Sequence, residues 1–151
     1  MPGEHVAVIE ATVDDMSPQV YGYFQEQALA AGALDVFATP AQMKKNRPGI
    51  NLTVVCEPAQ TAPLTALVFK ETTTIGVRRT LAQRQTLKRN FVEVQTVFGL
   101  VSIKESFWAG RRVNFAPEYE CCRRLAAGKG AALKEVLAAA TRAYLDLGRE
   151  S

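Results

Sequence analysis

The sequence has few of the residues on which metal centres and disulfide frameworks depend. Its 151 residues include one histidine, His5, and three cysteines, Cys56, Cys121 and Cys122. An odd number of cysteines with one adjacent pair fits neither a disulfide framework nor a zinc-binding spacing. A serine–histidine–carboxylate triad would depend on that single histidine near a chain end. We therefore exclude a histidine-rich metal site and such a triad, and we expect a reducing, cytoplasmic compartment.

Long apolar runs are also absent. Residues 28–34, the longest such run, contain a glycine and end at Asp35, far short of the ~20 residues that a membrane helix needs. The segment Met1–His5 has no basic stretch followed by an apolar one, so we expect no secretory signal and no membrane partner. With 48% hydrophobic and 22% charged residues, the composition excludes disorder and predicts a globular fold.

Charge is nearly balanced but unevenly distributed. Eighteen basic residues against fifteen acidic ones give a net charge of +3. This weak excess is compatible with a phosphorylated small molecule and does not require a polynucleotide, so no nucleic-acid partner is expected. The basic residues occur in clusters, of which the largest is Lys44-Lys45-Asn46-Arg47.

The hydrophobic pattern predicts an α+β fold. Alternation of apolar residues predicts strands at residues 5–13, 34–41, 50–56 and 75–81. Between them, helical spacing predicts two helices, from Pro18 to about Gly32 and over residues 61–70. The order strand, helix, strand, strand, helix, strand is the ferredoxin-like βαββαβ arrangement, an antiparallel sheet with both helices on one face. The first helix is expected to bury Val20, Tyr23, Phe24 and Leu29.

The remainder of the chain is expected to be a β-strand and two-helix extension of this core. Its strands are predicted near residues 83–97, 100–107 and 111–115, and its helices are predicted to start at Pro117 and Ala131. No flexible linker or repeat separates it from the core. We therefore expect a single domain over residues 1–151, with a core at about 5–81. An extension at about 82–148 would enlarge the sheet or dock on a neighbour.

The first candidate site is the acid pair Asp14-Asp15, at the end of the first predicted strand. Two carboxylates there suit Mg²⁺ or Mn²⁺, because such ions combine one or two carboxylates with substrate phosphate. The alternative is a turn that precedes a helix, in which the acids interact with the helix dipole. The dipeptide alone does not decide between a metal site and a turn before a helix.

The second candidate is the segment Lys44–Gly49, which offers three cations and an amide in a turn. Lysine charges, the arginine fork and backbone N–H groups together suit a triphosphate. A solvated hairpin tip is the alternative, since loop tips are often charged.

The third candidate is Glu71–Arg79, in which three threonines are followed by a glycine and two arginines. The hydroxyls suit phosphate or ribose oxygens, and Glu71 suits a metal or a ribose hydroxyl. The alternative is a threonine-rich helix end that runs into a strand. None of these segments is a P-loop, and Gly128-Lys129-Gly130 lacks the required glycine and hydroxyl.

Several motifs, in this order along the chain, resemble the C-terminal domain of the nickel insertion protein family, which makes the nickel-pincer cofactor of lactate racemase. They are Asp14-Asp15-Met16, Tyr21-Gly22-Tyr23, Ala31–Phe37, Thr39-Pro40, Met43–Gly49, Glu71–Arg79 and Pro117–Glu120. The resemblance covers nearly the whole chain.

That resemblance implies a nickel chelatase, or cyclometallase, acting on pyridinium-3,5-bisthiocarboxylic acid mononucleotide. It further implies a ferredoxin-like domain that assembles as a trimer or hexamer and binds CTP with Mn²⁺ or Mg²⁺. CTP would be hydrolysed to CMP and pyrophosphate in support of nickel insertion. Nickel itself would be handled mainly by the family's N-terminal domain, which this sequence does not contain and which would be a partner.

Residue chemistry assigns roles within the resembling motifs. Asp14 is the first choice for the metal, with Asp15 and Glu71 in reserve. Phosphates would be held by Lys44, Lys45, Arg47 and Arg78, and the nucleotide would be hydrogen-bonded by Asn46, Thr72, Thr73 and Thr74. Direct roles in catalysis are expected for Asp14, Lys44 and Arg47.

Two other functions remain to be weighed. A regulatory module of this fold would sense nucleotides without chemistry and would leave CTP intact. An RNA-binding module shares the βαββαβ order, but its stacking aromatics belong on the first and third strands. Residues 6–13 and 50–56 contain no Phe, Tyr or Trp, so this function ranks last.

Overall fold

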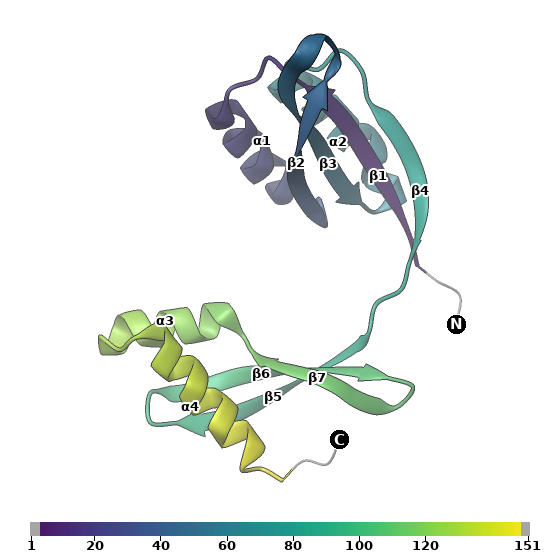
Figure 1. The fold of residues 1–151 in the computed structure, drawn as a ribbon. Coiled ribbons are helices and arrows are strands. Elements are labelled where there is room, and N and C mark those ends of the chain that lie inside the picture. Colours follow the sequence, from purple (N-terminus) through teal and green to yellow (C-terminus); the bar gives the residue numbers. More distant parts are fainter. Residues whose placement is uncertain (1–3, 149–151) are drawn as a thin grey trace. The chain divides into compact units, whose positions relative to one another are not determined.

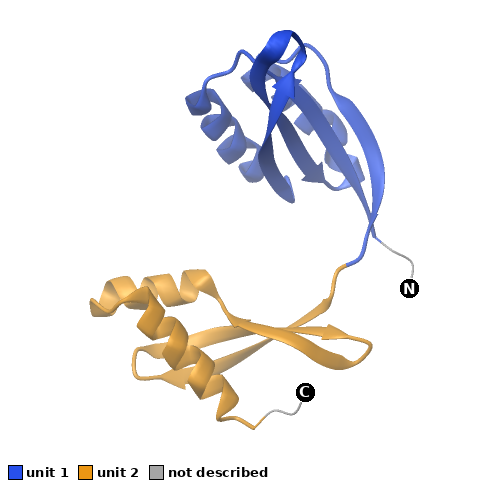
Figure 2. Ribbon diagram, in the orientation of Figure 1, with its two compact units in different colours: residues 1–85 blue, residues 86–151 orange. Residues whose placement is uncertain are grey.

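The chain forms two compact units, residues 1–85 and 86–151 (Figure 2). The computed structural model describes residues 4–148, so residues 1–3, on which the expectation of no secretory signal partly rests, lie outside that range. The division falls close to the border expected after residue 81. No helix within the described residues is long and apolar enough to cross a membrane.

The first unit has the predicted βαββαβ order (Figure 1). Its elements are β1 (Glu4–Val13), α1 (Pro18–Ala30), β2 (Asp35–Met43), β3 (Arg47–Cys56), α2 (Thr61–Glu71) and β4 (Arg78–Arg84). The sheet has the strand order β2-β3-β1-β4, and each neighbouring pair is antiparallel. The α+β class, the element order and the antiparallel pairing predicted from the sequence are confirmed.

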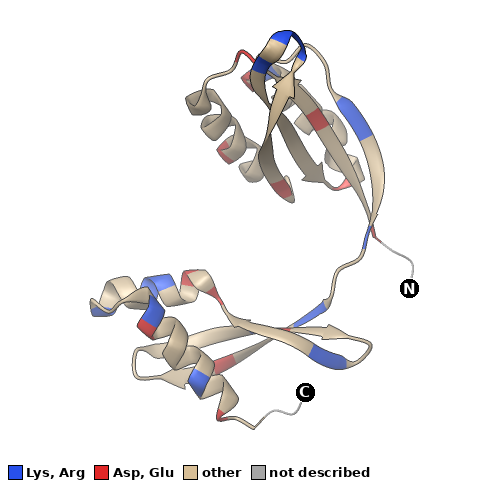
Figure 3. Ribbon diagram, in the orientation of Figure 1, with Lys and Arg blue, Asp and Glu red and all other residues tan. Residues whose placement is uncertain are grey.

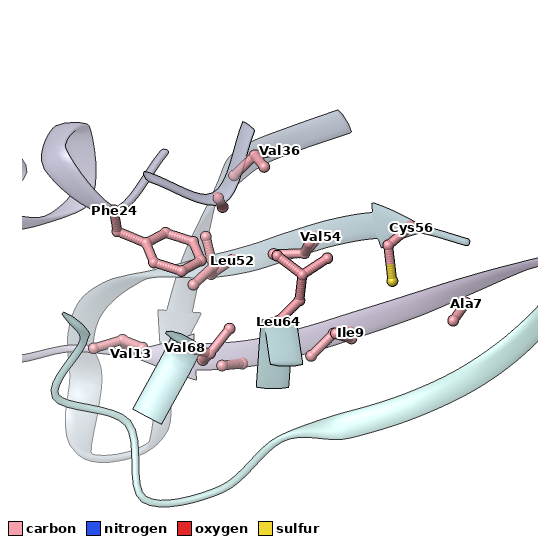
Figure 4. Packing of buried hydrophobic residues seen from close by; sticks show 12 residues of the cluster. Ala7, Ile9, Val13, Phe24, Val36, Leu52, Val54, Cys56, Leu64 and Val68 are labelled. Atoms are coloured by element: carbon pink, nitrogen blue, oxygen red, sulfur yellow. The ribbon is translucent and has the colours of Figure 1, made fainter. Parts of the chain in front are cut away.

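Both helices of this unit pack against one face of its sheet. Alternate β1 residues, among them Ile9 and Val13, belong to one buried cluster with Phe24 of α1 and Leu64 of α2 (Figure 4). The expected buried face of α1 is wrong in part, because Val20, Tyr23 and Leu29 are exposed. Phe24 and Ala28, one turn apart, are the buried residues of that helix.

Two predicted boundaries in the first unit also change. The expected turn over residues 44–49 is shorter, since Lys44–Asn46 form a 3₁₀ turn and residues 47–49 already pair with β2. The last strand starts later than predicted, at Arg78, and Ile75 lies fully exposed in the preceding loop.

The second unit forms a sheet of its own (Figure 1). It contains β5 (Lys88–Thr96), β6 (Gly99–Trp108), β7 (Arg111–Pro117), α3 (Tyr119–Lys129) and α4 (Leu133–Leu145). The three strands follow the order β5-β6-β7, so these residues do not enlarge the first sheet. Pro117 ends β7 instead of opening the helix. Each unit has its own core, and the single domain over residues 1–151 stays a prediction.

A buried polar network joins the strands of the second unit to α4. Glu105 is 3% exposed and accepts a hydrogen bond from the Tyr144 hydroxyl. Asn90 Nδ2 donates to the other oxygen of Glu105 at 3.1 Å, and Arg112 donates to the Tyr144 hydroxyl at 2.6 Å. Burial, followed by the hydrogen bond with Glu105, raises the pKa of Tyr144.

Tyr144→Phe is expected to lower the stability of the second unit by about 1–3 kcal/mol, because the buried Glu105 carboxylate loses the hydrogen bond from the Tyr144 hydroxyl. The raised pKa favours the neutral phenol in the folded state. In the wild type the contribution of Tyr144 to the free energy of unfolding is therefore fully present below a pH of about 10, and it is lost as the pH rises further. Trp108, the one tryptophan of the chain, reports the urea transition by fluorescence. Tyr119→Phe, at a residue 56% exposed, is the control; equal midpoints for the two variants would contradict the expectation.

Candidate functional site

The tip of the β2–β3 hairpin carries three of the predicted site residues. Lys45 and Asn46 have φ values of 59° and 58°, a left-handed conformation that is uncommon outside glycine. Strain of this kind gathers at functional sites. The conformation turns the chain within three residues and returns it as β3, so that Arg47 pairs with Met43.

Glycine at position 49 lets this hairpin approach the end of β1. A Cβ atom there would lie 2.6 Å from the Val13 carbonyl oxygen and 2.5 Å from the Met43 sulfur. Distances this short require a shift of the backbone as well as of the side chain. The glycine therefore brings the segment that carries Arg47 next to the residues that follow Val13.

Gly49→Ala is expected to destabilise the first unit by about 1–3 kcal/mol, since the added methyl group overpacks a fixed backbone contact. Gly22→Ala is the matched control, because Gly22 lies in α1 and a Cβ there would meet no atom within 4 Å. That change should stabilise the protein by about 0.5–1 kcal/mol. Urea denaturation measures both; a Gly49→Ala protein as stable as the wild type would refute the argument.

Three segments that are distant in sequence converge at the end of β1. An Arg47 guanidinium nitrogen lies 3.5 Å from an Asp14 carboxylate oxygen, and the Thr73 hydroxyl donates to Asp15 Oδ1 at 2.6 Å. A pocket of about 190 Å³ opens here, lined by Thr12, Val13, Asp14, Asp15, Thr73, Thr74 and Ile75. The acid pair, the hairpin and the threonine loop thus meet, and Figure 3 shows the basic hairpin tip beside the acidic residues after β1.

A polar cluster continues from this pocket across the sheet; we call it the open-face cluster, and it consists of Glu10, Thr12, Asn51 and Arg78. Arg78 donates to Thr12 Oγ1 and to Asn51 Oδ1, each at 3.1 Å. Asn51 Nδ2 in turn donates to Glu10 Oε1 at 2.9 Å. These side chains lie on the sheet face opposite the helices, because their strand neighbours Ile9, Ala11 and Leu52 are in the core.

Some predicted site residues make contacts with residues of their own segment. Glu71 pairs with Lys70 at 3.1 Å, and the Thr72 hydroxyl donates to the Val68 carbonyl at 2.7 Å at the end of α2. Asn46 Oδ1 accepts from Gln42 at 2.9 Å, within its own hairpin.

The lysines and the last threonine are placed differently. Lys44 and Lys45 are exposed at the hairpin tip, and neither has a hydrogen-bond or ion-pair partner within residues 4–148. Thr74 lines the pocket, where its hydroxyl donates to the Gly76 carbonyl at 2.8 Å. The lysines are therefore available to a ligand, and Thr74 holds the loop.

The carboxylates fit a divalent cation that is shared with a ligand. Among the described residues no group of three His, Cys, Asp or Glu side chains is placed to hold a metal, so Asp14, Asp15 and Glu71 do not form a complete protein cage. Mg²⁺ and similar ions are commonly held by one or two carboxylates together with substrate phosphates and water. Asp14 and Asp15, which both line the pocket, meet that requirement.

Sequence reasoning missed Glu10, Thr12 and Asn51 as site residues. Alternation already places Glu10 and Thr12 on the face of β1 opposite Ile9, Ala11 and Val13. Pairing in register then sets Thr12 opposite Asn51 on β3 and Glu10 opposite Arg78 on β4. The available signal was therefore a run of polar residues at alternate positions, which becomes a cluster only once the strand order is known.

The fold and the site together define an α+β protein whose acidic and basic side chains face each other at one end of a sheet. The sequence profile of the nickel insertion proteins matches residues 1–137. The pyridinium-3,5-bisthiocarboxylic acid mononucleotide nickel insertion protein of Clostridium acetobutylicum is 41% identical over 133 residues, covering 88% of this chain and 32% of that protein. Its counterpart from Clostridium kluyveri is 40% identical, covering 88% of this chain and 33% of the relative. The chain belongs to the nickel insertion protein family.

Two solved structures are similar to the chain. The chain is similar to LarC2, the C-terminal domain of a cyclometallase involved in the synthesis of the NPN cofactor of lactate racemase, in its apo form. The TM-score is 0.89 at 40% identity, covering 94% of this chain and 98% of that one. A protein from Methanopyrus kandleri AV19 has a TM-score of 0.68 at 25% identity, covering 96% of this chain and 89% of its own. The chain spans about one third of the length of the two clostridial relatives.

Proposed function

We propose that this chain binds CTP with Mn²⁺ or Mg²⁺ and hydrolyses it to CMP and pyrophosphate in support of nickel insertion. The observation that carries the proposal is the convergence of the acid pair, the basic hairpin and the threonine loop, with Arg47 3.5 Å from Asp14 and Thr73 2.6 Å from Asp15. Asp14 and Asp15, which line the pocket, would hold the cation, and the guanidinium group of Arg47 and the ammonium groups of the hairpin tip would bind the phosphates.

Each side chain has a role that follows from its position. Asp14 and Asp15 would hold the cation at the pocket wall. Arg47, which pairs with Asp14 at 3.5 Å, would turn to a phosphate when a cation takes its place beside the carboxylate. Lys44 and Lys45 at the hairpin tip would neutralise the outer phosphates.

Hydrolysis adds one water molecule to CTP. The water oxygen bonds to the α-phosphorus and releases a proton to the solvent, while the bond from that phosphorus to the bridging oxygen breaks and pyrophosphate leaves with the electron pair. Negative charge grows on the leaving oxygen, where Lys44, Arg47 and Arg78 are expected to stabilise it. When bound, the divalent cation supplies further charge neutralisation at the phosphates.

The remaining parts of the proposal concern the larger assembly. Because the chain is similar in sequence to the clostridial proteins, we expect the substrate of the complete protein to be pyridinium-3,5-bisthiocarboxylic acid mononucleotide, into which nickel would be inserted. The partner of this chain would be an N-terminal domain that handles the nickel. We further propose a homo-oligomer, trimer or hexamer, in the cytoplasm.

Titration calorimetry with CTP, ATP, GTP and UTP, each with and without Mn²⁺, tests the proposal. We expect CTP to bind most tightly and only with the metal present. Binding that does not depend on the base would contradict the assignment. Product analysis over time then separates an enzyme from a nucleotide sensor, because a sensor would bind CTP and leave it intact.

A further inference from the structure

The sheet of the second unit carries exposed aromatic side chains on the face that its core does not use. Strands β5 and β6 direct Val94, Val101 and Ile103 into the core that they share with α3 and α4. Side chains at the alternate positions point to the opposite face. Among them, Phe91 is 56% exposed and Trp108 is 51% exposed. Exposed rings of this kind on a sheet give a ligand a surface on which to stack.

Two arginines flank Trp108 on this face. Residues 109 and 110 form the turn between β6 and β7, and both have positive φ values, 48° and 80°, as a two-residue hairpin turn of type I′ requires. The turn sets Trp108 directly opposite Arg111. Arg89 lies diagonal to Trp108, because it pairs with Ser106, two residues earlier on β6. Side chains in these positions have Cβ atoms about 5 Å and about 7–8 Å apart, so both guanidinium groups can reach a ligand on the indole.

Both arginines are available to such a ligand. Arg89 and Arg111 are exposed, and neither has a hydrogen-bond or ion-pair partner within residues 4–148. Arg112, the next residue, points to the other face, where it donates to the Tyr144 hydroxyl. The exposed end of this sheet therefore presents one indole between two arginines that have no anion.

We propose that Trp108 stacks the ring of a pyridinium mononucleotide and that Arg89 and Arg111 bind its phosphate. This inference rests on the part of the proposed function that concerns the substrate. The substrate named for the clostridial relatives joins a cationic aromatic ring to a phosphate and two anionic thiocarboxylate groups. Indole is the side chain that best attracts a cation over its face, and the guanidinium fork matches a phosphate.

A strand of RNA is the alternative ligand for a sheet with aromatic and basic side chains. Such a strand needs a continuous basic track beside its stacking rings. Beyond the Trp108 end, Phe91 lies opposite Lys104, whose charge is paired with Glu118 at 3.4 Å. Glu93 follows on the same face of β5. The face therefore favours one ring with its own anionic groups over an extended polyanion.

Fluorescence of the full chain tests the stacking directly, because Trp108 is its one tryptophan. The probe is nicotinic acid mononucleotide, a pyridinium mononucleotide with a single carboxylate. A pyridinium ring stacked on indole quenches its fluorescence, since the excited indole transfers an electron to the ring. We expect quenching that saturates, and none from ribose 5-phosphate, which lacks the ring. Quenching that only rises in proportion to concentration, as random collision produces, would overturn the inference.

Arg111→Gln tests the phosphate contact. It should weaken binding of the mononucleotide by about 3- to 10-fold, since one charge-assisted hydrogen-bonding group is lost at an exposed site. Arg142→Gln is the matched control, because Arg142 is exposed on α4, which covers the other face of the sheet, and the change in charge is the same.

Trp108→Leu tests the ring contact by calorimetry with the same mononucleotide. Affinity should fall by about 10-fold, because the aliphatic side chain offers no aromatic face. Phe91→Leu removes an aromatic ring from the same face outside the proposed site and should leave the affinity unchanged. Thermal unfolding confirms that each variant is folded.

The outcomes separate this inference from the proposed function. If the chain binds CTP with Mn²⁺ but the mononucleotide neither quenches nor binds, only the inference is overturned; if the folded chain binds neither, both are wrong. A single-stranded oligouridylate that displaces the mononucleotide and binds more tightly would overturn the inference in favour of RNA. Saturable quenching that weakens in Arg111→Gln and not in Arg142→Gln supports it.

Discussion

Asp14→Asn is expected to reduce metal-dependent hydrolysis of CTP by at least about 100-fold, the upper range for loss of a group that supports a bound metal. The amide keeps the shape of the side chain but removes the negative charge that a divalent cation requires. Asp14 is exposed at the end of β1 and forms an ion pair with the exposed Arg47, so the fold should remain. The release of CMP, measured with and without Mn²⁺, gives the result.

Asp146→Asn is the matched control for that experiment. Asp146 is also exposed and follows α4 in the second unit, so the same chemical change is made at a residue that does not line the pocket. Its rate should equal that of the wild type. Unchanged turnover in Asp14→Asn would remove this residue from the site, and a loss in both variants would point to a general effect of charge.

Phe24→Ala is expected to lower the free energy of unfolding of the first unit by about 3–5 kcal/mol. Phe24 is fully buried in the cluster that joins α1 to the sheet, so its removal loses apolar burial and leaves a cavity. A domain of this size is stable by only about 5–15 kcal/mol in total. Urea denaturation followed by far-ultraviolet circular dichroism should show a much earlier transition.

Phe69→Ala provides the comparison. Phe69 lies on α2 and is 45% exposed, so the same truncation should cost about 1 kcal/mol or less. Because the buried cluster holds the end of β1 in place, Phe24→Ala should also weaken CTP binding near its unfolding midpoint. Equal losses of stability in the two variants would contradict this assignment of the core.

Much of the fold was predictable because its signals are local. Ser17 and Pro18 open α1, with the Ser17 hydroxyl accepting from Val20 N–H at 3.3 Å, and alternation along β1 identifies its buried face. The buried face of α1 was not predictable in full, since its apolar residues surround the helix and only packing selects Phe24. The separate second sheet depends on long-range pairing, which no local pattern specifies.

The sequence allowed the segments of the candidate site to be predicted, but not most of the contacts between their side chains. Composition and the family resemblance pointed to the acid pair, the basic hairpin and the threonine loop, and the structure brings these together. Thr72 and Asn46 carry the expected chemical groups, yet each hydrogen-bonds within its own local segment. Asn51 was missed because its place beside Glu10 and Arg78 follows from the order of three strands.

A crystal structure with Mn²⁺ and a CTP analogue that resists hydrolysis tests the central claim most directly. Anomalous scattering locates the manganese independently of the protein. We expect the peak within direct coordination distance of an Asp14 carboxylate oxygen, with the analogue's phosphates contacting Arg47 and the lysines of the hairpin tip. Manganese and triphosphate bound elsewhere, with Arg47 still paired to Asp14, would contradict the account.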